Sequence, residues 1–478
     1  MNIVQHFFQI AEKHPNRVAI ATGKRLWTFE QFAHLIRQKV AALEQKGYGN
    51  NDNLIVMIPV SVELYATILA IFYLGGRVVL VDQIFPKSRV AYAYGKAECK
   101  GIITLPLFSW TRWLFFSWSL FQKVFSLGKS AQTQRDISNK TPDETALLTF
   151  TSGTTGNPKS ANRTHGFLDI QLQTIIAKTG LQLGDVHLSS FPVVTMCNLA
   201  VGATSILPPK PGQKAAWAFL QRFCPITVVS ASVEHFNTYL PNIQQPHTLR
   251  KVVLGGSTLL PDFVKTVAQK IEPARIELVY GSTEAEPIAT LTAQEYLEQY
   301  RVEEKGVVVG NPHPNISVKI IQMDGEQWQE MPEGHIGEIM VAGPHVLASY
   351  YKDEQAFREN KLLINGTVWH RTGDAGYMRQ SMLYYFGRMS LAWKEAGEWV
   401  SPLTCEKWCA DNQLPPVATW LRLHDQNVLF FCGNDADYQR FNTVFPFPVH
   451  RTVRLSGLPK DKRHQSRIDY GLLKKELG

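Results

Sequence analysis

The sequence has 478 residues, 45% of them hydrophobic and 19% charged, and this balance excludes both a disordered chain and a small single-core domain. The formal net charge of +8 favours anionic partners such as nucleotides, phosphorylated carriers or an anionic membrane surface. Nucleic acid is disfavoured, because the dense basic clusters lie at residues 460–463 and 474–475 and no zinc-finger, homeodomain or RNP-like pattern accompanies them.

The six cysteines are scattered along the chain, with neither the spacing of a disulfide framework nor that of a zinc site. The first residues lack a basic region followed by an apolar stretch and a small-residue cleavage site, so we expect no secretory signal. Both features favour the cytoplasm, where thiols stay reduced.

The first half of the chain has the pattern of a β-α-β unit. Residues 54–60 and 78–82 are short β-branched runs, and the stretch between them has helical apolar spacing with a terminal Gly pair. Similar runs recur at 226–232, 249–256 and 275–282. This alternation predicts parallel sheets covered by helices.

Polar turns follow two of the later strands. These turns are GGS at 255–257 and GSTE at 281–284. Ligands of such sheets bind beyond the carboxyl ends of the strands, so both turns are candidate ligand-binding edges.

An aromatic segment at 105–128 contains three Trp and five Phe. Its uninterrupted apolar stretches are far shorter than the about 20 residues that a spanning helix needs. It suits peripheral contact with a membrane or the wall of an apolar substrate channel, and buried core or an irregular insertion is the plainer interpretation.

From about residue 306 the pattern changes to short strands with frequent Gly and Pro, which predicts an antiparallel β subdomain. Another change follows Arg388, and the last ninety or so residues are long enough for a small α+β lid domain. The expected fold class is therefore α/β, with a large domain at 1–386 and a small C-terminal domain at 387–478.

The segment Thr151 to Lys159 (TSGTTGNPK) follows the apolar run ALLTF, as a strand that feeds a loop of small residues ending in a cation. Such a loop suits polyphosphate, because glycine lets the backbone approach closely, hydroxyl and N–H groups donate to phosphoryl oxygens, and Lys159 neutralises charge. It is not a Walker A loop, because Pro158 stands where that loop has glycine. Alone, the segment would suit a surface turn equally well.

This loop is followed, in order, by further motifs. They are VYGSTEAEP (279–287), VGNPHP (309–314), GEIMVAG (337–343), WHRTGDAGY (369–377) and YFGR (385–388). Together they resemble the adenylate-forming superfamily, which includes acyl-CoA synthetases, peptide-synthetase adenylation domains and luciferases. The resemblance covers nearly the whole chain.

The resemblance implies a role for each matching residue. The ATP phosphates are held by Thr151, Ser152, Gly153, Thr154, Thr155, Gly156 and Lys159. The adenine pocket is bordered by Gly255, Gly256 and Ser257, with Tyr280 stacking near it.

The same resemblance places Thr283 on the α-phosphate and Glu284 on Mg²⁺. Asp374 accepts the ribose hydroxyls, and Arg388 reaches the ribose from the hinge. These roles suit the chemistry, because a metal and a cation stabilise charge that develops at phosphorus. An ionised carboxylate also offers two oxygens to two vicinal hydroxyls.

Two positions depart from the family pattern. Members usually carry a catalytic lysine in a late loop of the small domain, where this chain has Arg467, with Lys460 and Lys462 nearby. Arginine keeps the charge but not the compact ammonium. Ser390 stands where Asp or Lys commonly follows the Gly-Arg pair, so rotation of the small domain between half-reactions can differ or be absent.

The implied activity is that of an AMP-forming ligase that uses ATP and Mg²⁺ to activate a fatty-acid-like carboxylate as an acyl-adenylate. The acceptor is then a thiol, of CoA or of phosphopantetheine on an acyl carrier protein. The apolar segments 105–128 and 191–207 favour an aliphatic acid.

Three alternatives stay open. The segments at 189–208, 280–288 and 463–468 resemble a branch that contains the β-lactone synthetases of bacterial olefin biosynthesis, which need no thiol. Arg467 and Ser390 are also compatible with a nucleotide-binding homologue impaired in catalysis. A membrane-peripheral scaffold rests on the aromatic segment alone.

Overall fold

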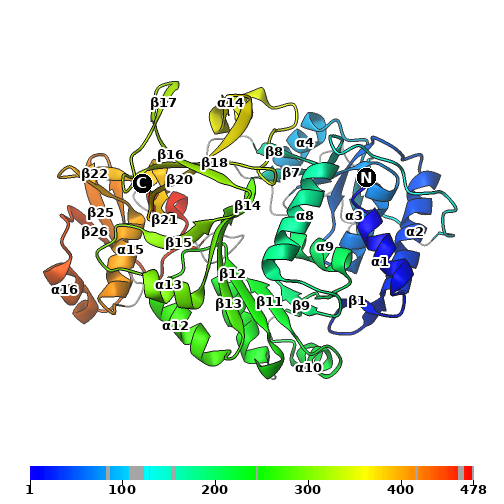
Figure 1. Ribbon diagram of the computed structural model, residues 1–478, viewed down its shortest axis with the longest axis horizontal. Helices are drawn as coiled ribbons and strands as arrows, with labels where there is room; N and C mark the ends of the chain where they lie inside the picture. The colour runs from blue at the N-terminus through cyan, green and yellow to red at the C-terminus, as the bar shows by residue number, and fades with distance from the viewer. Residues whose placement is uncertain are drawn as a thin grey trace. The chain divides into compact units, whose positions relative to one another are not determined.

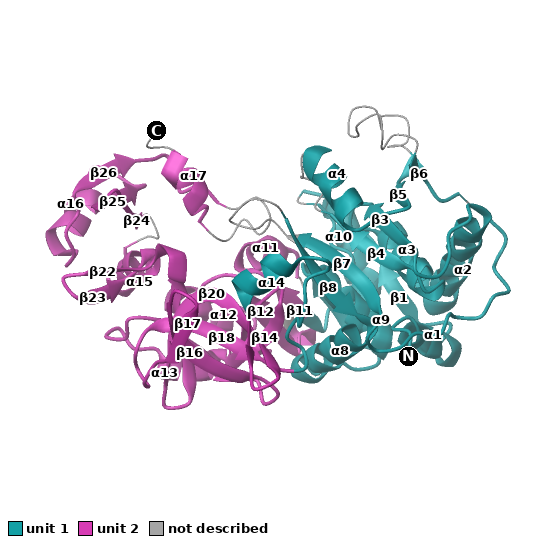
Figure 2. Ribbon diagram, turned by 90° about the horizontal axis from the view of Figure 1, so that it is seen from above, with its two compact units in different colours: residues 1–228, 344–361 teal, residues 229–343, 362–478 magenta. Residues whose placement is uncertain are grey.

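The computed structural model describes residues 1–81, 87–106, 123–128, 130–151, 158–210, 212–243, 246–414, 418–460 and 468–475. Contacts group them into two compact units, residues 1–228 with 344–361 and residues 229–343 with 362–478 (Figure 2). The domain boundary predicted after residue 386 stays a prediction. Three predicted features lie wholly or mostly outside the described residues: Ser152 to Gly156, the aromatic segment 105–128, and Arg467.

The first unit contains a mainly parallel sheet with the order β6-β5-β3-β4-β7-β8 (Figure 2), and its strands β7 and β8 can be followed in Figure 1. Its strands are β3 (Asn53–Met57), β4 (Arg77–Leu80), β5 (Gly101–Thr104), β6 (Val124–Phe125), β7 (Thr145–Thr151) and β8 (Lys159–Thr164). Only β8 runs antiparallel to its neighbour among these described strands. The predicted β-α-β unit is therefore present as β3, α3 (Val62–Tyr73) and β4.

A second strand group of this unit has the order β9-β10-β1-β2. These strands are β9 (Val186–Ser189), β10 (Thr204–Ile206), β1 (Val18–Ala21) and β2 (Leu26–Thr28). The other helices of the unit are α1 (Gln5–Lys13), α2 (Phe29–Gln45), α4 (Lys87–Lys96), α8 (His165–Thr179), α9 (Pro192–Val201), α10 (Lys214–Phe223) and α14 (Glu354–Asn360).

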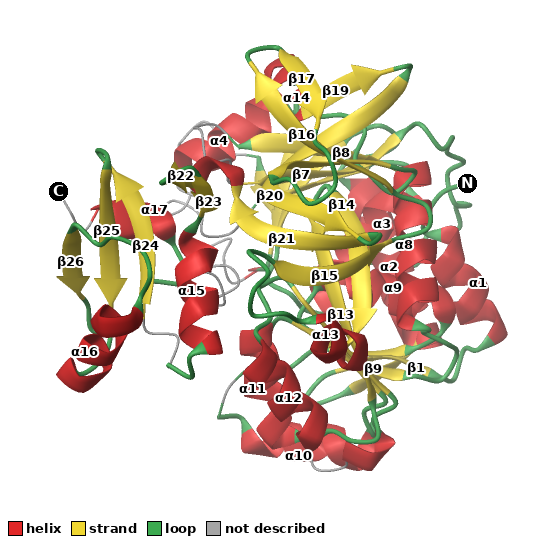
Figure 3. Ribbon diagram, turned by 60° about the vertical axis from the view of Figure 1, so that its left-hand side comes forward, coloured by secondary structure: helices red, strands yellow, loops and turns green. Residues whose placement is uncertain are grey.

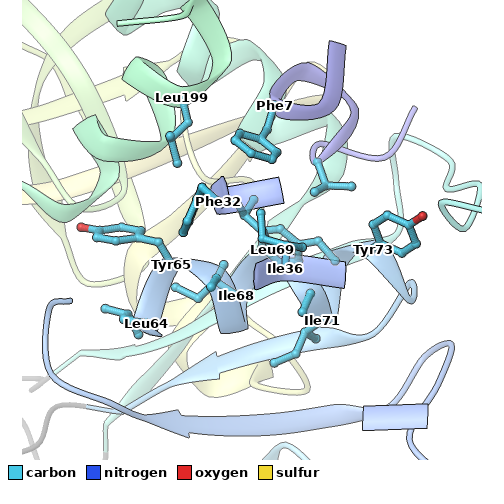
Figure 4. Packing of buried hydrophobic residues seen from close by; sticks show 14 of the residues in the cluster. Phe7, Phe32, Ile36, Leu64, Tyr65, Ile68, Leu69, Ile71, Tyr73 and Leu199 are labelled. Atoms are coloured by element: carbon cyan, nitrogen blue, oxygen red, sulfur yellow. The ribbon is translucent and has the colours of Figure 1, made fainter. Parts of the chain in front are cut away.

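Helix α3 lies at the centre of the main core. Ser61 caps it by accepting from the backbone N–H of Leu64, and every residue of the helix except Glu63 is buried. A helix that is apolar on all sides must be covered on all sides. Figure 4 shows its side chains among those of neighbouring helices, such as Phe7, Phe32 and Leu199.

The second unit begins with β11 (Val228–Ala231) and continues through β12 (Lys251–Gly255), β13 (Arg275–Ser282) and β14 (Ala285–Thr292). β12 and β13 are parallel, and β14 turns back antiparallel to β13. The accompanying helices are α11 (Val233–Tyr239), α12 (Pro261–Lys270) and α13 (Ala293–Gln299).

An antiparallel sheet follows with the order β17-β16-β18-β20-β21-β15. Its strands are β15 (Val307–Pro312), β16 (Ser317–Asp324), β17 (Gln327–Glu330), β18 (Gly337–Ala342), β20 (Thr367–Arg379) and β21 (Met382–Arg388), and β19 (Lys361–Ile364) pairs with β20. This sheet confirms the antiparallel subdomain predicted from about residue 306.

The C-terminal segment adds small sheets and helices (Figure 3). They are η3 (Met389–Leu391), β22 (Trp393–Glu395), β23 (Glu398–Val400), α15 (Pro402–Asp411), β24 (Ala418–Leu423), β25 (Gln426–Phe431), α16 (Asp435–Val444), β26 (Arg451–Arg454) and α17 (Tyr470–Lys475). The sheet order is β24-β25-β26. Contacts tie α15 to the rest of the unit, because Asp411 accepts from Tyr300 at 2.7 Å and Lys407 donates to the carbonyl oxygen of Val302 at 2.8 Å.

The α/β fold class and the small α+β C-terminal segment are thus as predicted. None of the helices that the structure describes is both long and apolar enough to span a bilayer.

We predict that Leu69→Ala lowers the free energy of unfolding by about 2–5 kcal/mol, because it leaves a cavity in the core around α3. Leu69 is 1% exposed. The measurement is the urea unfolding midpoint, with Leu183→Ala as the control, because Leu183 is 44% exposed. Equal shifts for the two variants would contradict the central place of α3 in the core.

Candidate functional site

Two parallel strands of the second unit end side by side at the predicted ligand edge. Gly255, the last residue of β12, pairs with Val279 of β13. A Cβ on Gly255 would lie 2.8 Å from the carbonyl oxygen of Val279, so the close approach of the strands requires glycine. Gly256 has a φ of 81°, in the left-handed region that favours glycine. The glycine pair therefore makes the turn that leads to Ser257.

Two serine hydroxyls at this edge are buried without a partner. They are Oγ of Ser257, after β12, and Oγ of Ser282, at the end of β13, and neither has a hydrogen bond within the described part of the chain. Buried polar atoms are rarely left unpaired in native proteins, and such groups mark positions that a ligand or water completes. The edge thus offers two hydroxyls to a bound molecule.

A buried carboxylate, Asp374 of β20, is held by residues from two other strands. The hydroxyl of Tyr280 donates to Oδ2 of Asp374 at 2.8 Å, and Nη1 of Arg388 lies 3.1 Å from Oδ1. Arg388 faces Asp374 directly in the β20–β21 register and also donates to the carbonyl oxygen of Thr372 at 3.2 Å. Each carboxylate oxygen has two acceptor sites, so Asp374 retains acceptors for further donors.

The two donors to Asp374 stay protonated at neutral pH. Burial raises the pKa of Tyr280 well above its ordinary value, and the Asp374 carboxylate raises it further. The same carboxylate raises the pKa of the half-exposed Arg388, and smaller contributions come from Tyr385 and Glu284. Asp374 therefore keeps both hydrogen bonds throughout the neutral range.

Thr283 and Glu284 form the tight turn between β13 and β14, since Ser282 pairs with Ala285. No cluster of three or more potential metal-ligating side chains occurs among the described residues. A single carboxylate fits Mg²⁺ bound to a nucleotide, because Mg²⁺ commonly takes one or two carboxylates together with phosphate oxygens and water. Glu284 is thus suited to be one ligand of the ion, with phosphate oxygens and water as the others.

A small cavity of about 40 Å³ lies beside Arg388. Its lining comes from β21, the β12 turn and the C-terminal segment, namely Thr258, Tyr385, Gly387, Arg388, Leu391, Pro402, Leu403, Glu406 and Tyr470. Removal from water raises the pKa of the Glu406 carboxyl to about 7, although hydrogen bonds donated by Tyr470 at 2.7 Å and Thr419 at 2.9 Å act in the opposite direction. The Glu406 carboxyl, with a pKa of about 7, therefore changes its protonation state near neutral pH.

The ends of the predicted phosphate loop belong to the first unit. Thr151 and Lys159 pair across the antiparallel β7–β8 ladder, so the described strands bring the two ends of the loop together. The Nζ of Lys159 donates to Oδ1 of Asn360, the last residue of α14, at 2.8 Å.

The predicted site residues therefore fall into three sets. The structure brings Tyr280, Asp374 and Arg388 together, and it places Gly255 to Ser257 and Thr283 to Glu284 at adjacent strand ends of the same unit. Thr151 and Lys159 are paired in the other unit. Ser152 to Gly156 and Arg467 lie outside the described residues.

Sequence reasoning missed two residues. The ring of Tyr385 lies 5.7 Å from that of Tyr280, and Asn360 contacts Lys159. Tyr385 immediately precedes the Phe-Gly-Arg run, so its position was visible but its contact was not. Asn360 is 201 residues from Lys159, and no local pattern marks it.

We predict that Glu406 makes the second unit less stable as pH rises. Its pKa is about 7 in the folded chain and 4.5 ordinarily, so between these values the folded state binds more protons than the unfolded state. The contribution of Glu406 to the free energy of unfolding is therefore fully present below pH 4.5 and is lost as pH rises toward about 7. Glu406→Gln removes this slope in urea unfolding midpoints across the range. The control Glu326→Gln, at an exposed position, should keep the slope of stability against pH. An unchanged slope in Glu406→Gln would show that Glu406 is not its source.

Comparison with protein families gives one match that covers most of the chain. Residues 7–351 match the family described as AMP-binding enzyme. The chain is 27% identical over 438 residues to an olefin beta-lactone synthetase of Stenotrophomonas maltophilia, covering 81% of this chain and 79% of that protein. It is 25% identical over 408 residues to a 2-succinylbenzoate–CoA ligase of Enterococcus faecalis, covering 83% and 80%.

Solved structures give the same fold. The O-succinylbenzoate coenzyme A synthetase of Bacillus subtilis, solved with ATP and a magnesium ion, aligns with a TM-score of 0.80 at 20% identity, covering 98% of this chain and 99% of that one. The expected resemblance is confirmed, including a relative from the suspected β-lactone branch. This chain belongs to the AMP-binding enzyme family of adenylate-forming ligases.

Proposed function

We propose that this chain uses ATP to activate a fatty-acid-like carboxylate as an acyl-adenylate and then transfers the acyl group to a thiol of CoA or of a carrier protein. The observation that carries the proposal is Asp374, held by Tyr280 and Arg388 in a chain of the AMP-binding family. A buried, oriented carboxylate with remaining acceptor sites is suited to the two hydroxyls of a ribose.

In the first half-reaction, a carboxylate oxygen attacks the α-phosphorus of ATP, and pyrophosphate leaves with the electrons of the broken P–O bond. We assign to Thr283, on the β13–β14 turn, a hydrogen bond to the α-phosphate, and to Asp374 the orientation of the ribose. Glu284 would hold Mg²⁺ in part, and the bound ion would neutralise charge on the phosphates. Lys159 adds a cation for the pyrophosphoryl group.

In the second half-reaction, a thiolate attacks the carbonyl carbon of the adenylate, and AMP leaves as the C–O bond breaks. The thiol acceptor is supported by the relative from Enterococcus faecalis, which is named a CoA ligase. Arg467 is proposed to contact the reacting carboxylate in place of the usual lysine, because it keeps the positive charge.

A second candidate is closure of a β-lactone. The relative from Stenotrophomonas maltophilia, named an olefin beta-lactone synthetase, aligns over 81% of the chain. In this reaction the hydroxyl on the β-carbon of the substrate attacks its own activated carbonyl, its proton passes to water, and AMP leaves. No thiol takes part.

The aliphatic nature of the acid rests on two apolar segments. Residues 191–207 include α9, whose Cys197 and Leu199 are buried in the main core, while Met196 is only partly buried. Part of that apolar pattern therefore reflects packing and not a substrate. The segment 105–128, rich in Trp and Phe, also suits contact with a membrane surface.

We expect the protein to release AMP and pyrophosphate from ATP and Mg²⁺ with a fatty acid or a β-hydroxy fatty acid. Mass spectrometry of the product, with and without CoA, separates the two candidates. A thioester that forms only with CoA supports the ligase. A product lighter than the β-hydroxy acid by one water, formed without CoA, supports lactone closure. Release of AMP with no acid of the panel would count against both.

We predict that Asp374→Asn weakens binding of both ATP and AMP by about tenfold or more, because it removes a charged acceptor for the ribose. The amide keeps the size of the side chain. The measurement is the dissociation constant of each nucleotide by calorimetry, with exposed Asp324→Asn as the control. Unfolding midpoints of the variant show whether Arg388, deprived of its partner, has destabilised the unit. Unchanged affinity in a folded variant would remove Asp374 from the nucleotide site.

A further inference from the structure

The segment 344–361 joins the first unit from far along the chain and pairs with β8. The backbone N–H of Tyr351 donates to the carbonyl oxygen of Ser160 at 2.8 Å, and the hydroxyl of Ser160 donates back to the carbonyl oxygen of Tyr351 at 2.8 Å. Ser160 directly follows Lys159, so these two bonds fix the segment beside the base of the Lys159 side chain.

Buried side chains hold α14 in the same place. Ala161 of β8 packs with Leu347, Tyr350 and Ala356. Lys361, which follows α14, is 2% exposed, with its ammonium over the ring of Tyr350 and bonded to the carbonyl oxygen of Leu347. The C-terminal end of α14 therefore cannot move freely relative to β8.

The amide of Asn360 stands at this end of the helix with a defined orientation. Its Nδ2 donates to the carbonyl oxygen of Ala356 at 2.8 Å, and its Oδ1 accepts from Nζ of Lys159 at 2.8 Å. Exchanging the amide oxygen and nitrogen would place a donor against the ammonium and an acceptor against a carbonyl, so only one orientation satisfies both contacts.

The amide of Asn360, which contacts Lys159, is neutral, so the positive charge of Lys159 stays available to an anionic ligand. A carboxylate at the same position would form an ion pair and cancel the positive charge. An amide oxygen restrains the ammonium through a hydrogen bond and leaves the net charge in place. We propose that Asn360 is a positioning residue that presents Lys159, with its charge intact, to the β- and γ-phosphates of ATP. This inference rests on the proposed function, which assigns the ATP phosphates to Lys159.

Two substitutions of Asn360 by residues of similar size separate the positioning of the Lys159 ammonium from the preservation of its charge. Asn360→Leu removes the acceptor, and we expect it to weaken ATP binding by about three- to tenfold, since a typical intramolecular hydrogen bond contributes about that much. Asn360→Asp keeps an acceptor and adds a negative charge, and we expect it to weaken ATP binding by about tenfold or more. AMP lacks the β- and γ-phosphates, so its affinity should stay unchanged in both variants.

The measurement is calorimetric binding of ATP and of AMP to the full-length protein with Mg²⁺. The matched control is Gln355→Ala, an exposed amide on the same helix whose Nε2 donates to Glu359. A merely structural role for Asn360 would weaken ATP and AMP binding equally. That outcome, or ATP affinity in Asn360→Asp equal to that of the wild type, overturns the proposal.

A second measurement does not depend on nucleotide. Trace acetylation followed by mass spectrometry reports how readily Lys159 reacts, and we expect its labelling to rise several-fold in Asn360→Leu and not in Gln355→Ala, because a restrained ammonium reacts slowly. Equal labelling in all variants would show that the contact does not persist in solution. Failure of the wild type to release AMP with any acid would count against the proposed ligase activity. The nucleotide-binding and acetylation measurements would still test the role of Asn360.

Discussion

The site of the second unit depends on one constraint, which is that the buried carboxylate of Asp374 must be paired. An isolated charge in a protein interior is costly. Here Arg388 pairs with one carboxylate oxygen of Asp374 and Tyr280 donates to the other, and together they offset that cost. The pairing follows from strand register, because Asp374 and Arg388 face each other across β20 and β21. A one-residue slip of this ladder would turn the side chains to opposite faces and leave the carboxylate unpaired.

The same constraint explains why the glycine-bounded edge and the carboxylate occur in one unit. Tyr280 lies on β13, one residue after Val279, which pairs with Gly255 of β12. Its hydroxyl therefore links the strand that carries the edge to the strand that carries Asp374. Loss of Tyr280 would remove one of the two donors that hold the carboxylate.

Under the proposed function, Asp374 and Lys159 have partners of opposite kinds. Asp374 meets neutral hydroxyls, so a cationic partner, Arg388, can balance its charge without loss of function. Lys159 meets phosphate, so its observed partner is the neutral amide of Asn360. Hydrogen bonds restrain both the Asp374 carboxylate and the Lys159 ammonium, but only the charge of Asp374 is balanced by its partner. This difference follows the charge of the ligand that each group is proposed to bind.

Much of this arrangement could be predicted from sequence, and the reasons are local. The β3-α3-β4 unit was visible because α3 is apolar throughout and is bounded by Ser61 and a Gly pair. The turns at Gly255 and Ser282 were visible because polar residues end β-branched runs. Asp374 and Arg388 were identified by resemblance, and their direct pairing needed the register of two strands.

Contacts between distant segments could not be predicted in this way. Nothing near Asn360 in the sequence indicates that it lies on Lys159, because the contact arises when the segment 344–361 pairs with β8. Burial likewise raises the pKa of Glu406, and a hydrogen bond from Tyr470, which is 64 residues away on α17, partly offsets that rise. Burial by remote chain segments, and not residue type, gives these groups their properties.

The cavity beside Arg388 connects the C-terminal segment to the carboxylate site within one unit. Arg388 is at once the partner of Asp374 and a wall of the cavity that Glu406 and Tyr470 line. A negative charge on Glu406 would therefore appear in the same small volume as the guanidinium. The described hydrogen bonds of the Glu406 carboxylate come from Tyr470 and Thr419, whereas Arg388 pairs with Asp374. Packing of α15 and α17 thus closes a cavity whose wall also includes the arginine that pairs with Asp374.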